Sequence, residues 1–189
     1  MVKKPQKDKI IDGALSVACR LGWQFVTMQD IATEAGVSLA DIREYFDDKD
    51  DILSGYGRRI DQKMLNAVSS QDMSSPIKDR LFEILMERFD LLNEDREALV
   101  SILSSFKQDP KQVIMSFPNV CKSMNWVLEA AGEDTNGLYG ALKVTGLTGA
   151  YIKVLNDWLD DDSEDMSKTM ASLDQALGQC EKLGGYLGI

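Results

Sequence analysis

The chain has 189 residues but no histidine, only three cysteines and only four prolines. Without histidine there can be no Ser-His-Asp or Cys-His catalytic arrangement, and most transition-metal sites are excluded. Cys19, Cys121 and Cys180 lie far apart and form no C-x-x-C pair, which favours reduced thiols over a disulfide framework or a zinc site. The scarcity of proline permits long helices.

Long hydrophobic runs and enzyme motifs are also missing. No apolar run approaches the roughly 18–20 residues that cross a bilayer, and the N-terminal segment lacks the apolar core of a signal peptide. We therefore expect a cytoplasmic protein with no transmembrane segment. No phosphate-binding glycine loop and no hydrolase motif occurs, so we expect no enzyme, no catalytic residue, no metal and no cofactor.

Acidic residues outnumber basic ones, and the net charge is −10. The excess is uneven, because nine basic side chains face ten acidic ones over residues 1–60 and the rest of the chain carries nearly all of the imbalance. A negative surface repels phosphate. Any nucleic-acid contact therefore belongs to the N-terminal third.

What the sequence does contain is helical periodicity almost throughout. Apolar residues recur at spacings of three and four, and no run alternates convincingly between apolar and polar residues. This pattern predicts an all-α fold of about nine helices, with a small N-terminal domain at 1–50 and a larger helical domain at 51–189. The expected helices cover about 10–21, 27–34, 38–45, 48–68, 77–92, 96–106, 111–131, 136–159 and 165–183, with a polar break at 69–76.

Residues 27–45 have the pattern of a helix-turn-helix. Thr27 can cap the first helix, and Ser38 can cap the second. Ala32 provides a small residue where two steeply crossing helices touch, and Gly36 provides the left-handed turn between them. In such a unit the second helix faces the major groove of DNA.

Residues 10–53, from IIDGAL through TMQDIATEAGVS to YFDDKDDIL, resemble the N-terminal domain of the TetR family of transcriptional regulators. The resemblance implies a nine-helix homodimer whose first three helices bind double-stranded DNA, whose middle helices enclose a small-molecule pocket and whose last two helices pair with the partner. Carried over by position, it implies phosphate contacts near Thr27, Tyr45 and Lys49. It places base readers at Leu39, Ala40, Asp41 and Arg43, on the helix that Ser38 caps.

The second half of this motif departs from the family pattern because residues 41–51 hold six acids and only two bases. Carboxylates near DNA are repelled by phosphates, although Asp41 could accept from a cytosine and Arg43 could bind a guanine. The acids at 47–51 can instead cap the following helix. Lys3, Lys4, Lys7 and Lys9 form either a basic arm that reaches the DNA or a solvated tail.

Two candidate surfaces lie in the larger domain. Small residues at Ala141, Thr145 and Gly149, together with a second stripe at Met170, Leu173 and Leu177, predict a four-helix dimer interface, or else packing within one subunit. A Met-rich, aromatic set could line an apolar ligand cavity or could form an ordinary core. Its members are Phe82, Met86, Phe89, Phe106, Met124, Trp126 and Tyr151.

The C-terminal segment DWLDDDSEDMSKTMASLDQAL also resembles a TetR-like family of lipid-binding proteins in ubiquinone biosynthesis, which keep the fold and do not act on DNA. Its acidic stretch at 157–165 lacks the spacing of a calcium loop, so we interpret it as a solvated turn and helix cap. Our leading prediction is a ligand-responsive transcriptional regulator, a repressor that binds a near-palindromic operator as a dimer and is released by a small apolar ligand or lipid. The alternative is an accessory protein of ubiquinone biosynthesis that binds lipid and not DNA.

Overall fold

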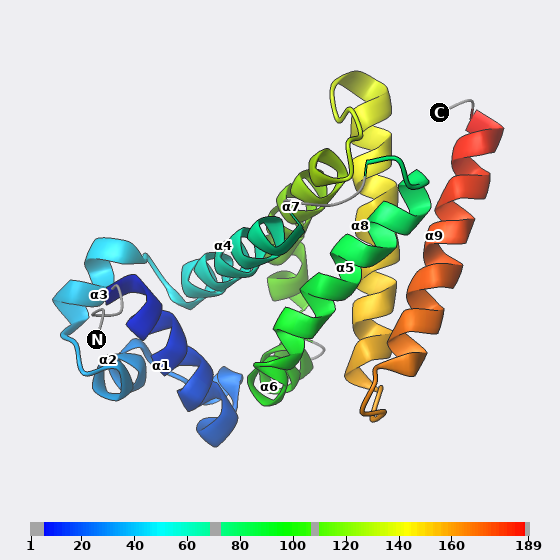
Figure 1. The fold of residues 1–189 in the computed structure, drawn as a ribbon. Helices are drawn as coiled ribbons and strands as arrows, with labels where there is room; N and C mark the ends of the chain where they lie inside the picture. Colours follow the sequence, from blue (N-terminus) through cyan, green and yellow to red (C-terminus); the bar gives the residue numbers. More distant parts are fainter. Residues whose placement is uncertain (1–5, 69–72, 107–109, 188–189) are drawn as a thin grey trace. The chain divides into compact units, whose positions relative to one another are not determined.

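The computed structural model describes residues 6–68, 73–106 and 110–187. These residues form nine α-helices, one short 3-10 helix and no strand, which confirms the all-α prediction (Figure 1). Residues 69–72, which are half of the predicted polar break, and the residues before Gln6 lie outside the described ranges. The elements are α1 (Gln6–Leu21), η1 (Trp23–Phe25), α2 (Met28–Ala35), α3 (Leu39–Tyr45), α4 (Lys49–Ala67), α5 (Ile77–Asn93), α6 (Arg96–Phe106), α7 (Pro110–Ala130), α8 (Gly137–Leu159) and α9 (Ser167–Leu187).

The chain divides into two compact units. The first unit comprises residues 1–60 and 91–119, and the second comprises residues 61–90 and 120–189. Helices α4, α5 and α7 therefore contribute residues to both units, and α6 belongs to the same unit as the helix-turn-helix. The predicted domain boundary near residue 50 separates a DNA-binding part from a regulatory part. A division of the chain into compact units does not test a boundary of that kind.

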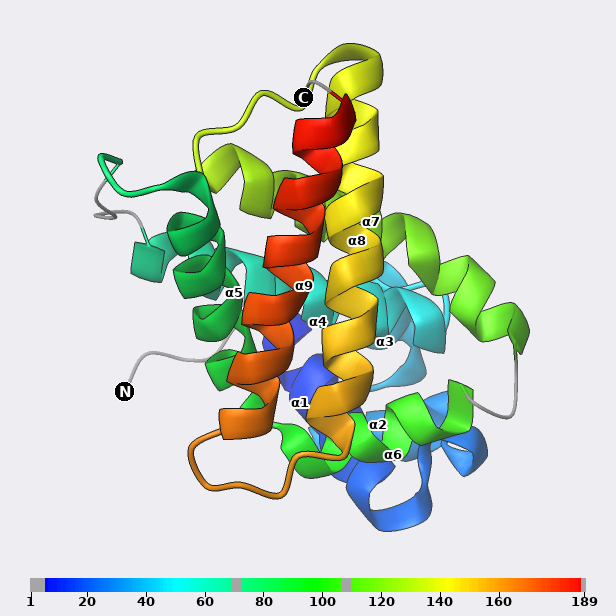
Figure 2. The same cartoon turned by 90° about the vertical axis from the view of Figure 1, so that its right-hand side faces the viewer.

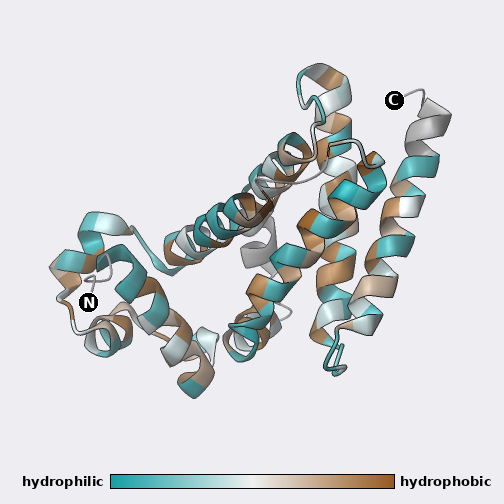
Figure 3. Cartoon of the chain, viewed as in Figure 1, coloured by the Kyte–Doolittle hydropathy of each residue, from teal (hydrophilic) through white to brown (hydrophobic). Residues whose placement is uncertain are grey.

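The first unit is built on the apolar face of α1, where Ile10, Ala14 and Ala18 are buried. Gly13 lies on the same face, and a Cβ atom at this position would stand only 3.0 Å from the Cβ of Ala35 at the end of α2. Glycine therefore permits the close approach of these two helices. Figure 3 shows that hydrophobic residues recur along the helices between hydrophilic ones.

Two of the four N-terminal lysines are not part of an arm. Lys7 and Lys9 lie within α1, which begins at Gln6, and the Lys7 ammonium stands 5.8 Å from the centre of the Phe46 ring. Charge over an aromatic face holds this side chain against the domain. Only Lys3 and Lys4 could belong to an extended arm, and they lie outside the described residues.

The second unit has an aromatic centre. The rings of Phe89 and Tyr151 stack with centroids 5.6 Å apart, and the Phe89 and Trp158 centroids are 6.4 Å apart. All three residues are buried. Helices α8 and α9 run side by side in this unit (Figures 1 and 2).

The acidic turn between α8 and α9 is not wholly solvated, which corrects our interpretation of it. Asp161 is only 2% exposed. Its carboxylate accepts hydrogen bonds from the backbone N–H and the hydroxyl of both Ser163 and Thr169. Burial alone would raise the pKa of Asp161, but these hydrogen bonds lower it well below its usual range. The turn thus anchors the start of α9.

None of the described helices is long and apolar enough to span a lipid bilayer.

Candidate DNA-binding and ligand sites

Two reciprocal capping boxes build the helix-turn-helix. The Thr27 hydroxyl accepts from the Asp30 N–H at 3.2 Å, while the Thr27 N–H donates to the Asp30 carboxylate at 2.9 Å. The Asp41 N–H donates to the Ser38 hydroxyl at 3.1 Å, and the Ser38 N–H donates to the Asp41 carboxylate at 2.8 Å. Between the two helices Gly36 has φ 65° and ψ 40°, which confirms the predicted left-handed turn.

The capping box gives Asp41 a local structural role. Its carboxylate also accepts from the Ser38 hydroxyl at 2.7 Å, and these hydrogen bonds lower the pKa of Asp41. A carboxylate engaged in this way favours the first turn of α3. All of these contacts from Ser38 go to one carboxylate oxygen of Asp41, so the cap and the predicted contact with a cytosine would share one carboxylate.

The remaining predicted readers and Tyr45, a predicted phosphate contact, lie on an exposed surface of α3. Leu39 is 47% exposed, and Ala40 and Tyr45 are exposed as well. The Arg43 guanidinium pairs with Asp47 one turn further on, where both side chains are about 70% exposed. An exposed pair of this kind contributes little free energy. Arg43 is therefore free to exchange Asp47 for a base edge or phosphate.

The acidic residues after α3 form the cap of α4. The Asp48 carboxylate accepts from the Asp51 N–H at 2.8 Å, and the Asp51 carboxylate accepts from the Asp47 N–H at 3.2 Å. Acids here also face the positive end of the α4 dipole. Much of the negative charge that seemed unsuited to DNA thus has a structural reason.

Lys49, predicted as a phosphate contact, is held by a residue that sequence reasoning missed. Its ammonium donates to the backbone oxygen of Trp23 at 3.1 Å and stands 5.0 Å from the centre of the Trp23 ring. Lys49 is half-buried, and burial lowers its pKa against the opposing effect of Asp50. Only an aromatic residue after a helix-ending glycine could have hinted at this role for Trp23.

A polar cluster inside the second unit draws one side chain from each of four helices. Arg88 on α5 donates to the carboxylate of Asp61 on α4 and, through Nε, to the hydroxyl of Tyr151 on α8 at 3.2 Å. Ser123 on α7 donates to the other Asp61 oxygen at 2.8 Å. Burial opposes the charge on Arg88, but Tyr151 and Asp61 favour it, so its pKa lies above the usual value. We call these four residues the buried polar cluster.

The predicted pocket residues differ in burial and lie in both compact units. Phe89, Met124 and Tyr151 are packed in the core of the second unit, and Phe82 and Met86 are half-buried on α5. Phe106 lies on α6, in the first unit.

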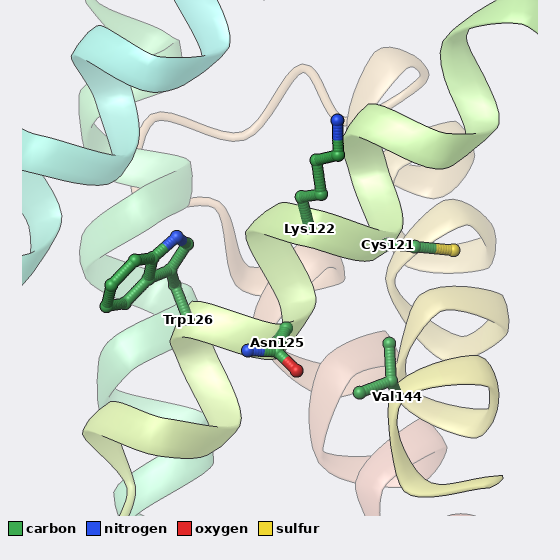
Figure 4. Close-up of a pocket in the computed structure, with 5 residues that line it drawn as sticks. All are labelled: Cys121, Lys122, Asn125, Trp126 and Val144. Carbon is green, nitrogen blue, oxygen red and sulfur yellow. The ribbon is translucent and has the colours of Figure 1, made fainter. Parts of the chain in front are cut away.

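Trp126 is on the surface rather than in an internal cavity, because 55% of it is exposed. It lines an open hollow of about 330 Å³. The hollow is lined by Cys121, Lys122, Asn125 and Trp126 of α7 and by Val144 of α8, which Figure 4 labels.

The two predicted dimer stripes also have different surroundings. On α8, Ala141, Thr145 and Gly149 are exposed. On α9, Leu173 is 0% and Leu177 is 2% exposed, and Met170 is half-buried. Leu173 and Leu177 therefore pack within the chain and cannot reach a partner in this conformation, which corrects their place in the predicted interface.

Comparison with known proteins agrees with this geometry. Residues 10–55 match the family model described as "Bacterial regulatory proteins, tetR family". The fatty acid metabolism regulator protein of Bacillus subtilis (strain 168) is 23% identical over 170 residues, which cover 86% of this chain and 88% of the relative.

Solved structures share the fold over nearly the whole chain. A TetR transcriptional regulator from Nitrosomonas europaea ATCC 19718 is 27% identical, with a TM-score of 0.73 and coverage of 93% of this chain and 98% of that one. The fatty acid degradation regulator FadR from Bacillus halodurans is 20% identical, with a TM-score of 0.61 and coverage of 94% and 97%.

The two capped helices, the Gly36 turn and these matches define the class of the N-terminal domain. Residues 10–55 match the N-terminal domain of TetR-family regulators, and the described residues have the all-α fold of such regulators. The relatives named above are regulators, and the weaker resemblance to the ubiquinone-biosynthesis family has no support among them.

Proposed function

We propose that the protein is a transcriptional repressor that binds a near-palindromic operator as a homodimer and is released by a small apolar ligand. The observation that carries this proposal is the exposed surface of α3, held on a rigid helix-turn-helix by the Ser38 cap and the Gly36 turn. A dimer would place two such helices in major grooves roughly 34 Å apart. Ligand binding would favour a conformation in which that spacing is lost.

The exposed surface of α8 supports a dimer. An added Cβ at Gly146 or Gly149 would meet nothing within 4 Å, so packing within the chain does not require glycine there. Glycine inside a helix costs roughly 1 kcal/mol relative to alanine. Exposed Leu138, Leu142 and Ile152 lie on the same side of α8 as Gly149. A partner helix that approaches closely along this side explains both features.

For the ligand we propose a fatty acyl compound. The aligned regulator of Bacillus subtilis is named for fatty acid metabolism. The interior of the second unit around Phe89 and Trp158 is apolar and aromatic, and a hydrocarbon chain would match it chemically if ligand binding opened a cavity there. The ubiquinone-related alternative rests on the resemblance of the C-terminal segment at 157–177, and the acidic residues at 41–51 were only compatible with it. Because several of these acids cap helices and the relatives named above are regulators, we favour the regulator.

Operator binding can be tested with single substitutions measured by fluorescence anisotropy. Arg43→Ala should reduce discrimination between operator and unrelated DNA by about 1–3 kcal/mol, because one base contact is lost. Lys49→Ala should weaken binding to all sequences and reduce the salt slope by about one. If both variants bind like the parent, these residues are not the DNA contacts.

The ligand half of the proposal needs a separate titration. Long-chain acyl-coenzyme A or the free fatty acid, added to the protein–operator complex, should lower the anisotropy to that of free DNA. The short-chain acyl-coenzyme A or short-chain acid, each with the charge of its long-chain counterpart, is the matched control and should leave the complex intact. An operator complex that survives saturating long-chain compounds would exclude this ligand class.

A further inference from the structure

The peptide groups of Trp23 connect α6 to the lysine that we propose binds phosphate. The Trp23 N–H donates to the Ser101 hydroxyl on α6 at 3.2 Å, and the Trp23 carbonyl accepts from Lys49 at 3.1 Å. The Ser101 hydroxyl in turn donates to the Ala18 carbonyl at 2.8 Å. Trp23 is 1% exposed, and all four residues belong to the first compact unit. We call this chain of contacts the Trp23 junction.

The junction sets where the Lys49 ammonium stands. An ammonium has three donor hydrogens, and the Trp23 carbonyl takes one of them while the indole face lies against the charge. The half-buried group still has donor capacity for an anion. A lysine on a mobile stem must otherwise give up rotamer freedom when it meets a phosphate. Lys49 has already given up much of that freedom in the absence of DNA.

Ser101 holds the Trp23 peptide in this orientation. Its hydroxyl accepts from one backbone group and donates to another, so both of its hydrogen-bonding functions are used. Removing the hydroxyl would leave the Trp23 N–H without this partner in a largely buried place. The backbone would be expected to move to regain a hydrogen bond. The Trp23 carbonyl belongs to the next peptide group and also accepts from the Val26 N–H at 3.2 Å, and it would shift with this movement.

We propose that Ser101 is a positioning residue for DNA binding, which acts through the Trp23 peptide to hold Lys49 ready for a backbone phosphate. This inference rests on the proposed DNA-binding function. It assigns a role to a residue of α6, 52 positions away from Lys49 in the sequence and outside the helix-turn-helix. It also gives a route by which a displacement of α6 would weaken DNA binding.

The test compares Ser101→Ala with Ser104→Ala, which removes an exposed hydroxyl from the same helix. Affinity for operator DNA is measured between about 50 and 200 mM salt, where each phosphate contact contributes about 0.9 to the slope. Ser101→Ala should weaken binding about two- to tenfold and flatten the slope, as expected for loss of one well-placed hydrogen bond. Ser104→Ala should match the wild type, and Ser101→Thr, which keeps the hydroxyl, should recover most of the affinity.

A double-mutant cycle separates positioning from general destabilisation. In a Lys49→Gln background, Ser101→Ala should have almost no further effect on affinity, because the group that it positions is absent. An equal loss in both backgrounds, or a wild-type salt slope in Ser101→Ala, would overturn the proposal. Far-ultraviolet circular dichroism at the assay temperature confirms that each variant is folded.

The positioning step is also measured without DNA. The Lys49 Cε resonance should carry a ring-current shift from Trp23, and Ser101→Ala should move it toward the value of a free lysine. If this resonance does not move in Ser101→Ala, the positioning role is overturned, even if the wild type binds DNA. A different outcome is that the wild type does not bind an operator but its Lys49 resonance still moves in Ser101→Ala. This outcome refutes the proposed DNA-binding function and the phosphate role of Lys49, whereas the connection between Ser101 and Lys49 stands.

Discussion

Replacing Arg88 by methionine should destabilise the second unit far more than removing an exposed charge. Arg88 is 5% exposed and Asp61 is 9% exposed, so the substitution leaves the Asp61 carboxylate buried without its cation. Breaking a buried pair from one side costs about 3–5 kcal/mol. Domains are typically stable by only about 5–15 kcal/mol, so this is a large fraction of the total. Asp61→Leu should cost a similar amount.

The double variant Asp61→Leu/Arg88→Met provides the decisive comparison. It removes both charges and refills the space with apolar atoms, which is often close to neutral for a buried pair. The hydroxyls of Ser123 and Tyr151 then lose partners, at a cost of about 1–3 kcal/mol each. The double variant should therefore remain below the wild type but lose clearly less stability than the sum of the two single losses.

Urea unfolding followed by circular dichroism measures these differences at one fixed protein concentration, because a dimer makes stability depend on concentration. With a slope of about 2 kcal/mol per molar, each single variant should unfold at a urea concentration roughly 1.5–2.5 M lower. Arg43→Met, which removes one member of an exposed pair, is the control and should shift the midpoint little. Simple additivity of the two single losses in the double variant would refute this account of the buried polar cluster.

Three further predictions follow from local geometry. Ser38→Ala should cost about 1 kcal/mol of stability and weaken operator binding, whereas Ser38→Thr should retain both, as measured by thermal unfolding and anisotropy. Gly149→Gln should shift the sedimentation coefficient of the protein toward that of a monomer, because the larger side chain would block a close partner helix. Gly149→Ala should leave the dimer intact, and a dimeric Gly149→Gln protein would contradict the proposed interface. The lowered pKa of Asp161 means that its contribution is fully present above the unfolded-state pKa of about 3.9 and is lost as the pH falls toward the folded-state pKa. The stability difference between wild type and Asp161→Asn should therefore be constant near neutral pH and shrink below about pH 4. A difference that grows on acidification would show that the hydrogen bonds from Ser163 and Thr169 do not stabilise the ionised carboxylate of Asp161.

The helix-turn-helix could be predicted because its determinants are local. Thr27 and Ser38 each cap a helix through an aspartate three residues later, and Gly36 alone supplies the left-handed turn. These relations are encoded within a few residues of sequence. The same local logic showed that acids at 47–51 could cap α4, as Asp48 does.

The buried polar cluster and the Trp23 junction could not be predicted, because they join residues far apart in the chain. Arg88 and Tyr151 are separated by 63 positions, and Trp23 and Ser101 by 78. Helical periodicity indicates which residues share a face, but it does not indicate what that face contacts. For this reason the stripe of Met170, Leu173 and Leu177 could be assigned either to a partner or to packing within one subunit, and Leu173 and Leu177 pack inside the chain.

The central claim, that the protein recognises a specific operator, is tested most directly by DNA enrichment. Purified protein is incubated at low salt with fragmented genomic DNA from the organism that encodes it, and the bound fragments are recovered and sequenced, with a second recovery at higher salt. We predict a few strongly enriched sites that share a near-palindrome with half-sites about one helical turn apart and that persist at the higher salt. Uniform recovery of all fragments, or no recovery even at low salt, would contradict the claim.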